Sequence, residues 1–394
     1  RQGYTGDGQV FALTGAYNFN TDAFWKNFLR DLELGQLDNT EGYVCATVPQ
    51  TGPAGIGFIS MLGWGNAVTI LPEMMYRQFG DEEALPRQYE SMKLFVEAEI
   101  RKMGKKNLWI GPSLGDWLAM GKGIAWQAMH NNPVSNAFIV HDLKVISETA
   151  ERLGKREDAA RYRRQLAATT DAYIKKFVSK NGIVAKDYQS AYIMALKFVL
   201  PEGELREMVK KNFVANIRKN GLQTGFFATE HLLPLLVEAG EQKLAYDVLL
   251  QENCPGWMYQ VKCGATTTWE RWDALKPDGT VNEEKMAGSG ENMVSFNHYA
   301  FGSVGEFYYQ YILGIRPEKP GFAKLHFAPY PDERLGGVSG SYLSVAGKIE
   351  SAWRYEPDGC HIRLATPVEA VVLLPDGRSE NVPAGTYEWT VKRP

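Results

Sequence analysis

The sequence lacks the surplus of positive charge that nucleic-acid binding requires. Its 43 Lys and Arg residues face 46 Asp and Glu residues, so the formal net charge is −3. A protein that neutralises a phosphate backbone carries a basic excess or a basic face, and we therefore expect no nucleic acid as a partner. The sequence also has no apolar run of about 18 residues, so no membrane-spanning helix is expected.

Cysteine is scarce, and the motifs of several large enzyme classes are missing. The four cysteines, Cys45, Cys254, Cys263 and Cys360, are too far apart for a metal-ligand cluster or a dense disulfide framework. We find no phosphate-binding glycine loop, zinc-protease histidine pair, dinucleotide fingerprint or nucleophile elbow. We therefore expect no metal and no cofactor. The remaining candidate catalytic residues are carboxylates, aromatic residues and one histidine. These residue types favour glycoside chemistry over phosphoryl transfer or redox chemistry.

The chain has enough apolar residues for a large core. The spacing of its hydrophobic residues changes once along the sequence, from helical to alternating. Hydrophobic residues make up 44% and aromatic residues 12% of the sequence. Helical periodicity dominates residues 1–317, with predicted helices that include 115–130, 156–178 and 295–312. Short alternating runs separated by Pro-Asp-Gly turns fill residues 318–394. This pattern predicts a mainly α protein, a stacked helical array followed by a small C-terminal β-sandwich.

The densest cluster of reactive residues lies between Gly264 and Asp273. Glu270 stands between Trp269 and Trp272, next to Arg271. Apolar rings raise the pKa of a carboxyl group and an adjacent guanidinium lowers it, a balance that suits a general base. A buried Glu–Arg pair with packed tryptophans explains the same residues, and the sequence leaves both interpretations open.

Other candidates are weaker when each is taken alone. Tyr4 and Asp7 lie in a glycine-containing turn, which can equally be the first turn of a helix with Asp7 near its cap. His298 can bind a hydroxyl group or serve as a structural residue. Three further candidates lie next to glycines, where a ligand can approach or a tryptophan can pack: Trp64, Asp116 and Trp117.

Taken together, these motifs resemble the bacterial α-L-rhamnosidases of glycoside hydrolase family 78. The matching segments run in the family's order: Arg1 to Asp7, Gly63-Trp64-Gly65-Asn66-Ala67, Gly115-Asp116-Trp117-Leu118-Ala119, Tyr259 to Lys262, Gly264 to Asp273, and Asn297 to Glu306. The resemblance implies an (α/α)6 barrel followed by a β-sandwich. It also implies release of terminal α-L-rhamnose with inversion, for which two carboxyl groups suffice.

The resemblance also implies roles for individual residues. Glu270 matches the general base and Asp7 a carboxylate that holds sugar hydroxyls. The remaining expected substrate contacts are Tyr4, where the family usually has Trp, and Trp64, Asp116, Trp117, Trp269, Trp272 and His298. Asn66 stands where the family usually has Asp. The family's general acid, a glutamate, falls immediately before Arg1, so we expect this sequence to be part of a longer protein that also supplies the first barrel helix.

Two alternatives remain open from the sequence. A non-catalytic sugar-binding homologue would share the aromatic residues but lack the acid. A polysaccharide lyase on a similar helical toroid would use His298 and Tyr299 as base and acid, and would need a basic cluster to neutralise a uronate. The expected partner is a rhamnose-containing glycoside or oligosaccharide. The sequence indicates neither the aglycone nor the oligomeric state nor the cellular compartment.

Overall fold

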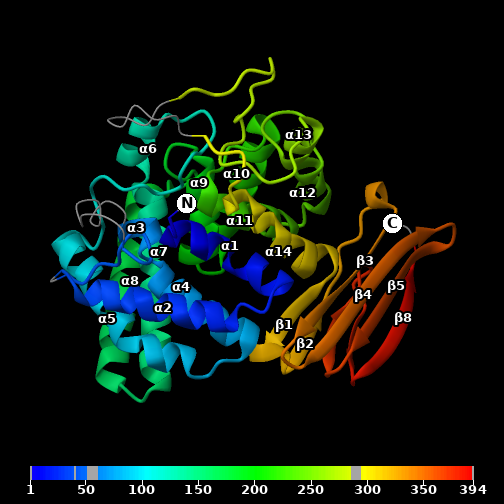
Figure 1. The fold of residues 1–394 in the computed structure, drawn as a ribbon, viewed down its shortest axis with the longest axis horizontal. Helices are drawn as coiled ribbons and strands as arrows, with labels where there is room; N and C mark the ends of the chain where they lie inside the picture. Colours follow the sequence, from blue (N-terminus) through cyan, green and yellow to red (C-terminus); the bar gives the residue numbers. More distant parts are fainter. Residues whose placement is uncertain (1, 40, 51–60, 285–293, 393–394) are drawn as a thin grey trace. The chain divides into compact units, whose positions relative to one another are not determined.

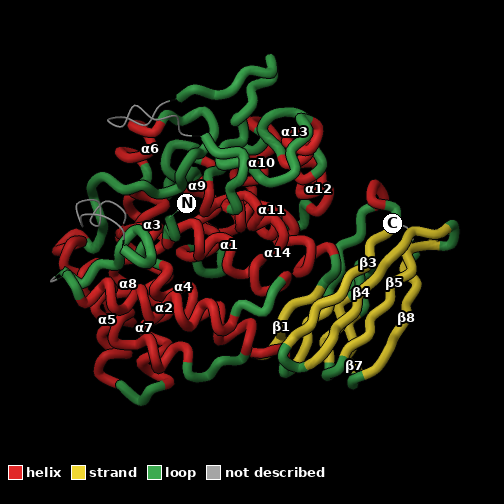
Figure 2. Tube along the Cα trace, viewed as in Figure 1, coloured by secondary structure: helices red, strands yellow, loops and turns green. Residues whose placement is uncertain are grey.

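The computed structural model describes residues 2–39, 41–50, 61–284 and 294–392, with helices in the first three quarters of the chain and strands at its C-terminal end (Figures 1 and 2). The helices are α1 (Thr5–Asn18), α2 (Asp22–Leu37), α3 (Met61–Trp64), α4 (Ala67–Phe79), α5 (Ala84–Met103), α6 (Ile124–His130), α7 (Asn132–Arg152), α8 (Arg156–Phe177), α9 (Gln189–Met194), α10 (Glu204–Asn220), α11 (Phe226–Glu238), α12 (Gln242–Leu249), α13 (Trp257–Lys262) and α14 (Gly305–Phe307). Within the described ranges, no helix is long and apolar enough to cross a membrane.

The chain divides into two compact units that are not continuous in sequence. The first comprises residues 1–11, 27–71 and 86–302, and the second comprises residues 12–26, 72–85 and 303–394. The second unit thus combines the strand region with two short pieces of the helical part. The boundary expected after residue 317 stays a prediction.

Helices of the first unit alternate between buried and half-exposed elements. Helix α7 is buried along most of its length, whereas the following α8 buries little more than Ala159, Tyr162, Thr169 and Tyr173. The same alternation recurs in the buried α9 and the amphipathic α10, and again in α11 and α12. Pairs of one inner and one outer helix are the building blocks of a barrel made of helical hairpins, because only the inner helix is covered on all sides.

The strands of the second unit form two four-stranded sheets. One sheet has the order β1 (Ile315–Lys319), β2 (Lys324–Phe327), β6 (Ala370–Leu373), β7 (Ser379–Val382), and the other has the order β3 (Gly337–Ser344), β4 (Gly347–Glu356), β5 (Gly359–Thr366), β8 (Gly385–Val391). Buried side chains alternate along the strands, as Ile349, Ser351 and Trp353 do in β4. Apolar residues from the two sheets meet, since the rings of Phe327 in β2 and Trp389 in β8 stack at 6.1 Å. This is the predicted sandwich.

Two predicted helices are wrong over part of their length. Residues 115–123 are irregular, with Leu118 at a positive φ of 59°, and helix begins only at Ile124. Residues 295–299 are likewise not helical, because they pair with another segment through backbone hydrogen bonds from Glu270 to Ser295 and from His298 to Thr268. Over residues 115–123 the apolar spacing reflects burial of Trp117, Leu118 and Ala119 rather than helical periodicity.

Candidate active site

The structure brings together Asp7, Glu270 and His298, three predicted site residues from distant parts of the sequence. His298 Nε2 lies 2.9 Å from Asp7 Oδ1 and 3.8 Å from Glu270 Oε1. All three are buried, with exposed fractions of 2%, 4% and 1% for Asp7, Glu270 and His298. A single imidazole nitrogen therefore lies between two buried carboxylates.

The tautomer of His298 follows from its second ring nitrogen. The backbone N–H of Ala300 donates to Nδ1 over 3.2 Å. Because Nδ1 accepts this bond, the proton of the neutral ring is on Nε2. His298 therefore donates a hydrogen bond to Asp7 and fixes the direction of that carboxylate.

The loop carrying Glu270 is fixed by an extended pairing with the segment that carries His298. The Glu270 N–H donates to the Ser295 carbonyl, and the His298 N–H donates to the Thr268 carbonyl, each over 2.8 Å. Thr268 Oγ1 adds a bond to the His298 carbonyl at 2.7 Å. The threonine run before Trp269 favours this extended backbone, because β-branched residues prefer the β region.

The two tryptophans that flank Glu270 are buried packing elements of this loop. Trp272 stacks on Phe301 with a centroid distance of 3.9 Å and donates from Nε1 to the Thr224 carbonyl. Trp269 packs edge-on against Tyr259 and Phe296. Their exposed fractions are 0% and 3%, and they hold the Glu270 loop rigid from both sides.

Arg271 pairs with carboxylates other than Glu270. Its Nε lies 3.1 Å from Asp273 Oδ1, and its Nη2 lies 2.7 Å from Glu284 Oε2. Asn282 supports Asp273 with a further hydrogen bond. The sequence suggested that Arg271 balances the charge of Glu270, but the structure assigns the guanidinium to Asp273 and Glu284.

An aromatic cluster adjoins the helix turn that carries Asp7. Trp64 packs edge-on against Trp117 at 6.3 Å and against Phe227 at 5.1 Å. Gly6 lies so close to the Trp64 indole that an added Cβ would be 2.7 Å from the ring. The positive φ of Gly63, 97°, turns the chain before Trp64. Trp64 therefore lies directly against the turn that presents Asp7.

Asp116 acts as a capping residue for α11. Its Oδ1 accepts the N–H groups of Phe227 and Ala228, and its Oδ2 accepts that of Gly225. Burial raises the pKa of Asp116, against the opposing effect of the hydrogen bonds from these backbone groups. Phe227 packs on Trp64. By accepting the Phe227 N–H, Asp116 therefore supports the aromatic cluster without being one of its rings. Tyr4 pairs with Thr47 in a short β-bridge at the start of α1.

A buried polar network that the sequence did not suggest supports this cluster. Asn66 accepts the Gly63 N–H on Oδ1 and donates from Nδ2 to Asp142 at 2.5 Å, with Glu99 at 3.4 Å. Thr69 donates to the other oxygen of Asp142 at 2.6 Å. Asn66, Asp142 and Glu99 are completely buried. The only sequence signal was Asn66 itself, which departs from the family's usual Asp.

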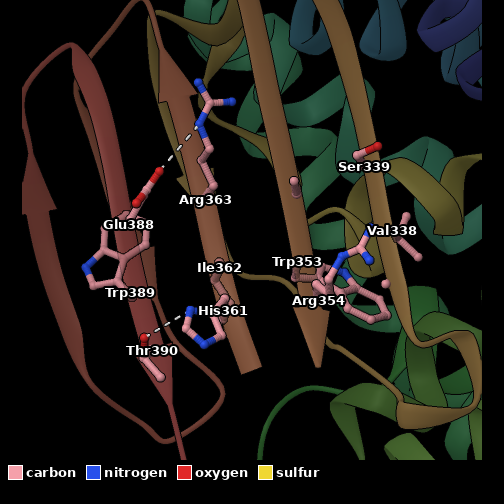
Figure 3. Close-up of a pocket in the computed structure, with 12 residues that line it drawn as sticks. Val338, Ser339, Trp353, Arg354, His361, Ile362, Arg363, Glu388, Trp389 and Thr390 are labelled. Atoms are coloured by element: carbon pink, nitrogen blue, oxygen red, sulfur yellow. Dashed lines mark hydrogen bonds and ion pairs between the residues drawn. The ribbon is translucent and has the colours of Figure 1, made fainter. Parts of the chain in front are cut away.

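A hollow of about 370 Å³ on the β3–β4–β5–β8 sheet offers no comparable chemistry (Figure 3). Figure 3 shows its carboxylate, Glu388, directed at Arg363 of the neighbouring strand, with 3.9 Å between the charged groups. Thr390 and His361 form a second polar pair there. In the described part of the chain no cluster of three or more His, Cys, Asp or Glu side chains is arranged to hold a metal ion.

Comparisons with known proteins agree with this arrangement. Residues 1–312 match the family model of the bacterial alpha-L-rhamnosidase 6 hairpin glycosidase domain, and residues 314–387 match that of the bacterial alpha-L-rhamnosidase C-terminal domain. The chain belongs to the bacterial alpha-L-rhamnosidase family. Its relatives in this family include an alpha-L-rhamnosidase of Alteromonas sp. (strain LOR), which is 33% identical over 376 residues, covering 93% of this chain and 40% of the relative.

Solved rhamnosidase structures confirm the predicted fold class, an (α/α)6 barrel followed by a β domain. The alpha-L-rhamnosidase of Streptomyces avermitilis, solved in complex with L-rhamnose, superposes with a TM-score of 0.90 at 30% identity, covering 99% of this chain and 38% of that one. The alpha-L-rhamnosidase of Aspergillus terreus superposes with a TM-score of 0.90 at 29% identity, covering 99% of this chain and 46% of that one. The chain thus spans about two fifths of the length of these rhamnosidases.

Proposed function

We propose that the protein to which this chain belongs is an inverting α-L-rhamnosidase that releases terminal α-L-rhamnose from a glycoside or oligosaccharide. The observation that carries the proposal is the buried cluster of Asp7, His298 and Glu270 in a chain of the rhamnosidase family. Inverting hydrolysis needs a carboxylate that activates water on one face of the sugar and an acid on the other.

In this proposal Glu270 is the general base. Its carboxylate is excluded from bulk solvent, and its backbone is held by Ser295. Pre-organisation of this kind reduces the reorganisation needed when a water molecule is deprotonated. His298 and Asp7 bind hydroxyl groups of the sugar as one hydrogen-bonded unit, because the Nε2 proton of His298 orients Asp7.

Asp7 fits the role of a sugar-holding group better than that of the general acid. Asp7 Oδ1 lies 2.9 Å and Glu270 Oε1 lies 3.8 Å from the same atom, His298 Nε2. The distance between the two carboxylate oxygens therefore cannot exceed the sum of these two distances. That span reaches only the lower limit of the roughly 6.5–9.5 Å that separates acid and base in inverting enzymes. We therefore infer that the acid is a separate residue, the glutamate expected immediately before Arg1.

The sugar ring is bound beside the aromatic cluster in this proposal. Trp64 and Trp117 offer apolar edges for the methyl group of the deoxysugar, and Tyr4 lies three residues before Asp7. Trp269 and Trp272 contribute through the Glu270 loop, which they pack, and Asp116 contributes by capping the helix that carries Phe227. The direct contacts expected from these three residues remain predictions.

Product stereochemistry tests the proposal. The full-length protein is mixed with an α-L-rhamnoside and proton NMR spectra are collected before mutarotation. We expect β-rhamnose as the first product. Initial α-rhamnose would indicate a covalent intermediate and would make Glu270 a nucleophile. Absence of free rhamnose would identify a non-catalytic homologue, and an unsaturated product absorbing in the ultraviolet would identify a lyase.

A further inference from the structure

Helix α1 contacts two different parts of the candidate active site with two of its faces. Asp7 and Phe11 are four residues apart and therefore share one face of the helix. On this face Asp7 Oδ1 meets His298, and the ring of Phe11 packs against that of Tyr299 with a centroid distance of 5.4 Å. This face therefore contacts the segment that carries the histidine.

The neighbouring face of α1 contacts the segment that carries Trp64. Gly6 and Gln9 are three residues apart and share this face. Gly6 lies against the Trp64 indole, and Gln9 donates from Nε2 to the Gly63 carbonyl over 2.6 Å. Gln9 is 4% exposed, so bulk water does not compete for this bond. A single helix thus relates the position of Trp64 to that of Asp7.

The backbone of Gly63 is held on both sides by buried amides. Asn66 Oδ1 accepts its N–H, and Gln9 donates to its carbonyl. The φ of Gly63 is 97°, and a Cβ there would be 2.9 Å from the Phe227 ring, so this conformation requires glycine. The direction in which Trp64 leaves the chain therefore depends on both amides, and Gln9 is the one that belongs to α1.

The Gln9 amide is not arranged for greatest stability. Its Oε1 is buried and has no hydrogen-bond partner in the described ranges, and such a group has a cost in folding free energy. Gln36, a buried glutamine of α2, uses both ends of its amide, because Nε2 donates to the carbonyls of Gly42 and Ser91 and Oε1 accepts the Ser91 hydroxyl. This difference favours a role of Gln9 in placing Gly63.

We propose that Gln9 is a positioning residue for sugar binding, which holds Gly63 so that the Trp64 indole stays at a fixed place beside the turn that presents Asp7. This inference rests on the proposed rhamnosidase function, in which Trp64 meets the methyl group and Asp7 holds hydroxyl groups of the same ring. Without the Gln9 bond, the Gly63 peptide relaxes and the indole moves away from this turn. Gln9 takes no part in bond cleavage, because the proposed base, Glu270, lies on another segment.

Two aryl glycosides measure the position of the indole, an α-L-rhamnoside and the α-L-lyxoside, which lacks only the methyl group. One such group in an apolar pocket changes kcat/KM by about 10–200-fold, so we expect the full-length wild type to prefer the rhamnoside by a factor in this range. Gln9→Met keeps the length of the side chain and removes the donor. We expect it to lower the preference at least about threefold, through a higher KM for the rhamnoside and with kcat nearly unchanged.

Gln36→Met is the matched control, because it removes a buried amide that also donates to backbone carbonyls, those of Gly42 and Ser91. It should lower the melting temperature and leave the preference for the rhamnoside unchanged. Gln9→Leu is measured beside Gln9→Met, so that the result does not depend on the folding of one variant, and circular dichroism checks the fold of all three.

An unchanged preference in the folded Gln9 variants would overturn the proposal, and so would an equal fall in the Gln36→Met control. A wild type that hydrolyses the rhamnoside without preferring it to the lyxoside would also overturn it, because the indole would then not meet the methyl group. If the wild type releases no rhamnose from the aryl rhamnoside, the proposed function itself fails, and that outcome is distinct from a change in preference.

Discussion

Substitution of Glu99 by glutamine is expected to change how stability depends on pH. Glu99 is completely buried, 3.4 Å from the Asn66 amide that donates to Asp142. Burial, followed by the charge of Asp142, raises the pKa of Glu99 well above its usual value. Asp142 accepts bonds from Thr69 and Asn66, so we assign the proton of this buried pair to Glu99.

The sign of the effect follows from this proton. The folded state retains it above pH of about 4.3, where an unfolded glutamate releases it. Unfolding then releases a proton, so the wild-type free energy of unfolding falls as pH rises, by up to about 1.4 kcal/mol per pH unit from this one group. Glu99→Gln keeps the shape and a donor toward Asp142 but cannot ionise, so its stability lacks this slope.

Urea unfolding of wild type, Glu99→Gln and the exposed control Glu82→Gln at pH 5, 6, 7 and 8 measures the difference directly. We expect the free energy of unfolding of Glu99→Gln to increase relative to that of wild type as pH rises, while that of the control changes in parallel with wild type. Other titratable groups lie near Asp142, namely His141 at 3.4 Å and, beyond it, His231 and Lys197. Their contributions to the pH dependence are the same in wild type and variant, so they cancel in the difference between the two. A difference that stays constant from pH 5 to 8 would refute the assignment of the proton to Glu99.

Further predictions concern the aromatic cluster and its support. Trp64→Ala removes a side chain that is 4% exposed and packed on Trp117 and Phe227, so unfolding experiments should show a loss of about 3–5 kcal/mol; a loss below about 1 kcal/mol, as expected for the exposed Phe19→Ala, would contradict this packing. Asp116→Ala leaves three backbone N–H groups without their acceptor and should cost about 2 kcal/mol, whereas an unchanged melting temperature would show that water replaces the carboxylate.

Regular elements were predictable because their signals are local. The helix predicted over 156–178 is α8, whose apolar face repeats every three or four residues and buries Ala159, Tyr162 and Tyr173. The Pro-Asp-Gly turn at Pro357–Gly359 separates β4 from β5, as its residue types indicate. The resemblance to a known family then placed Asp7, Glu270 and His298 in one site.

Features that depend on tertiary contacts were not predictable. Apolar spacing predicts a helix over 115–130, but residues 115–123 are irregular and helix begins only at Ile124. The meeting of Glu99 with Asp142 needs two helices, α5 and α7, to be placed side by side. One ion-pair partner of Arg271 is Glu284, and no local sequence pattern connects these two residues.

The turnover of Glu270→Gln in the full-length protein tests the central claim most directly. The substitution keeps the shape of a buried side chain held by Ser295 and close to His298, but it removes the proposed base. We predict that turnover on an aryl α-L-rhamnoside falls by about 10²–10⁴-fold, while rhamnose still binds and the control Glu252→Gln, at an exposed ion pair with Lys262, remains fully active. Turnover of Glu270→Gln within a few-fold of wild type would contradict the assignment of Glu270 as the general base.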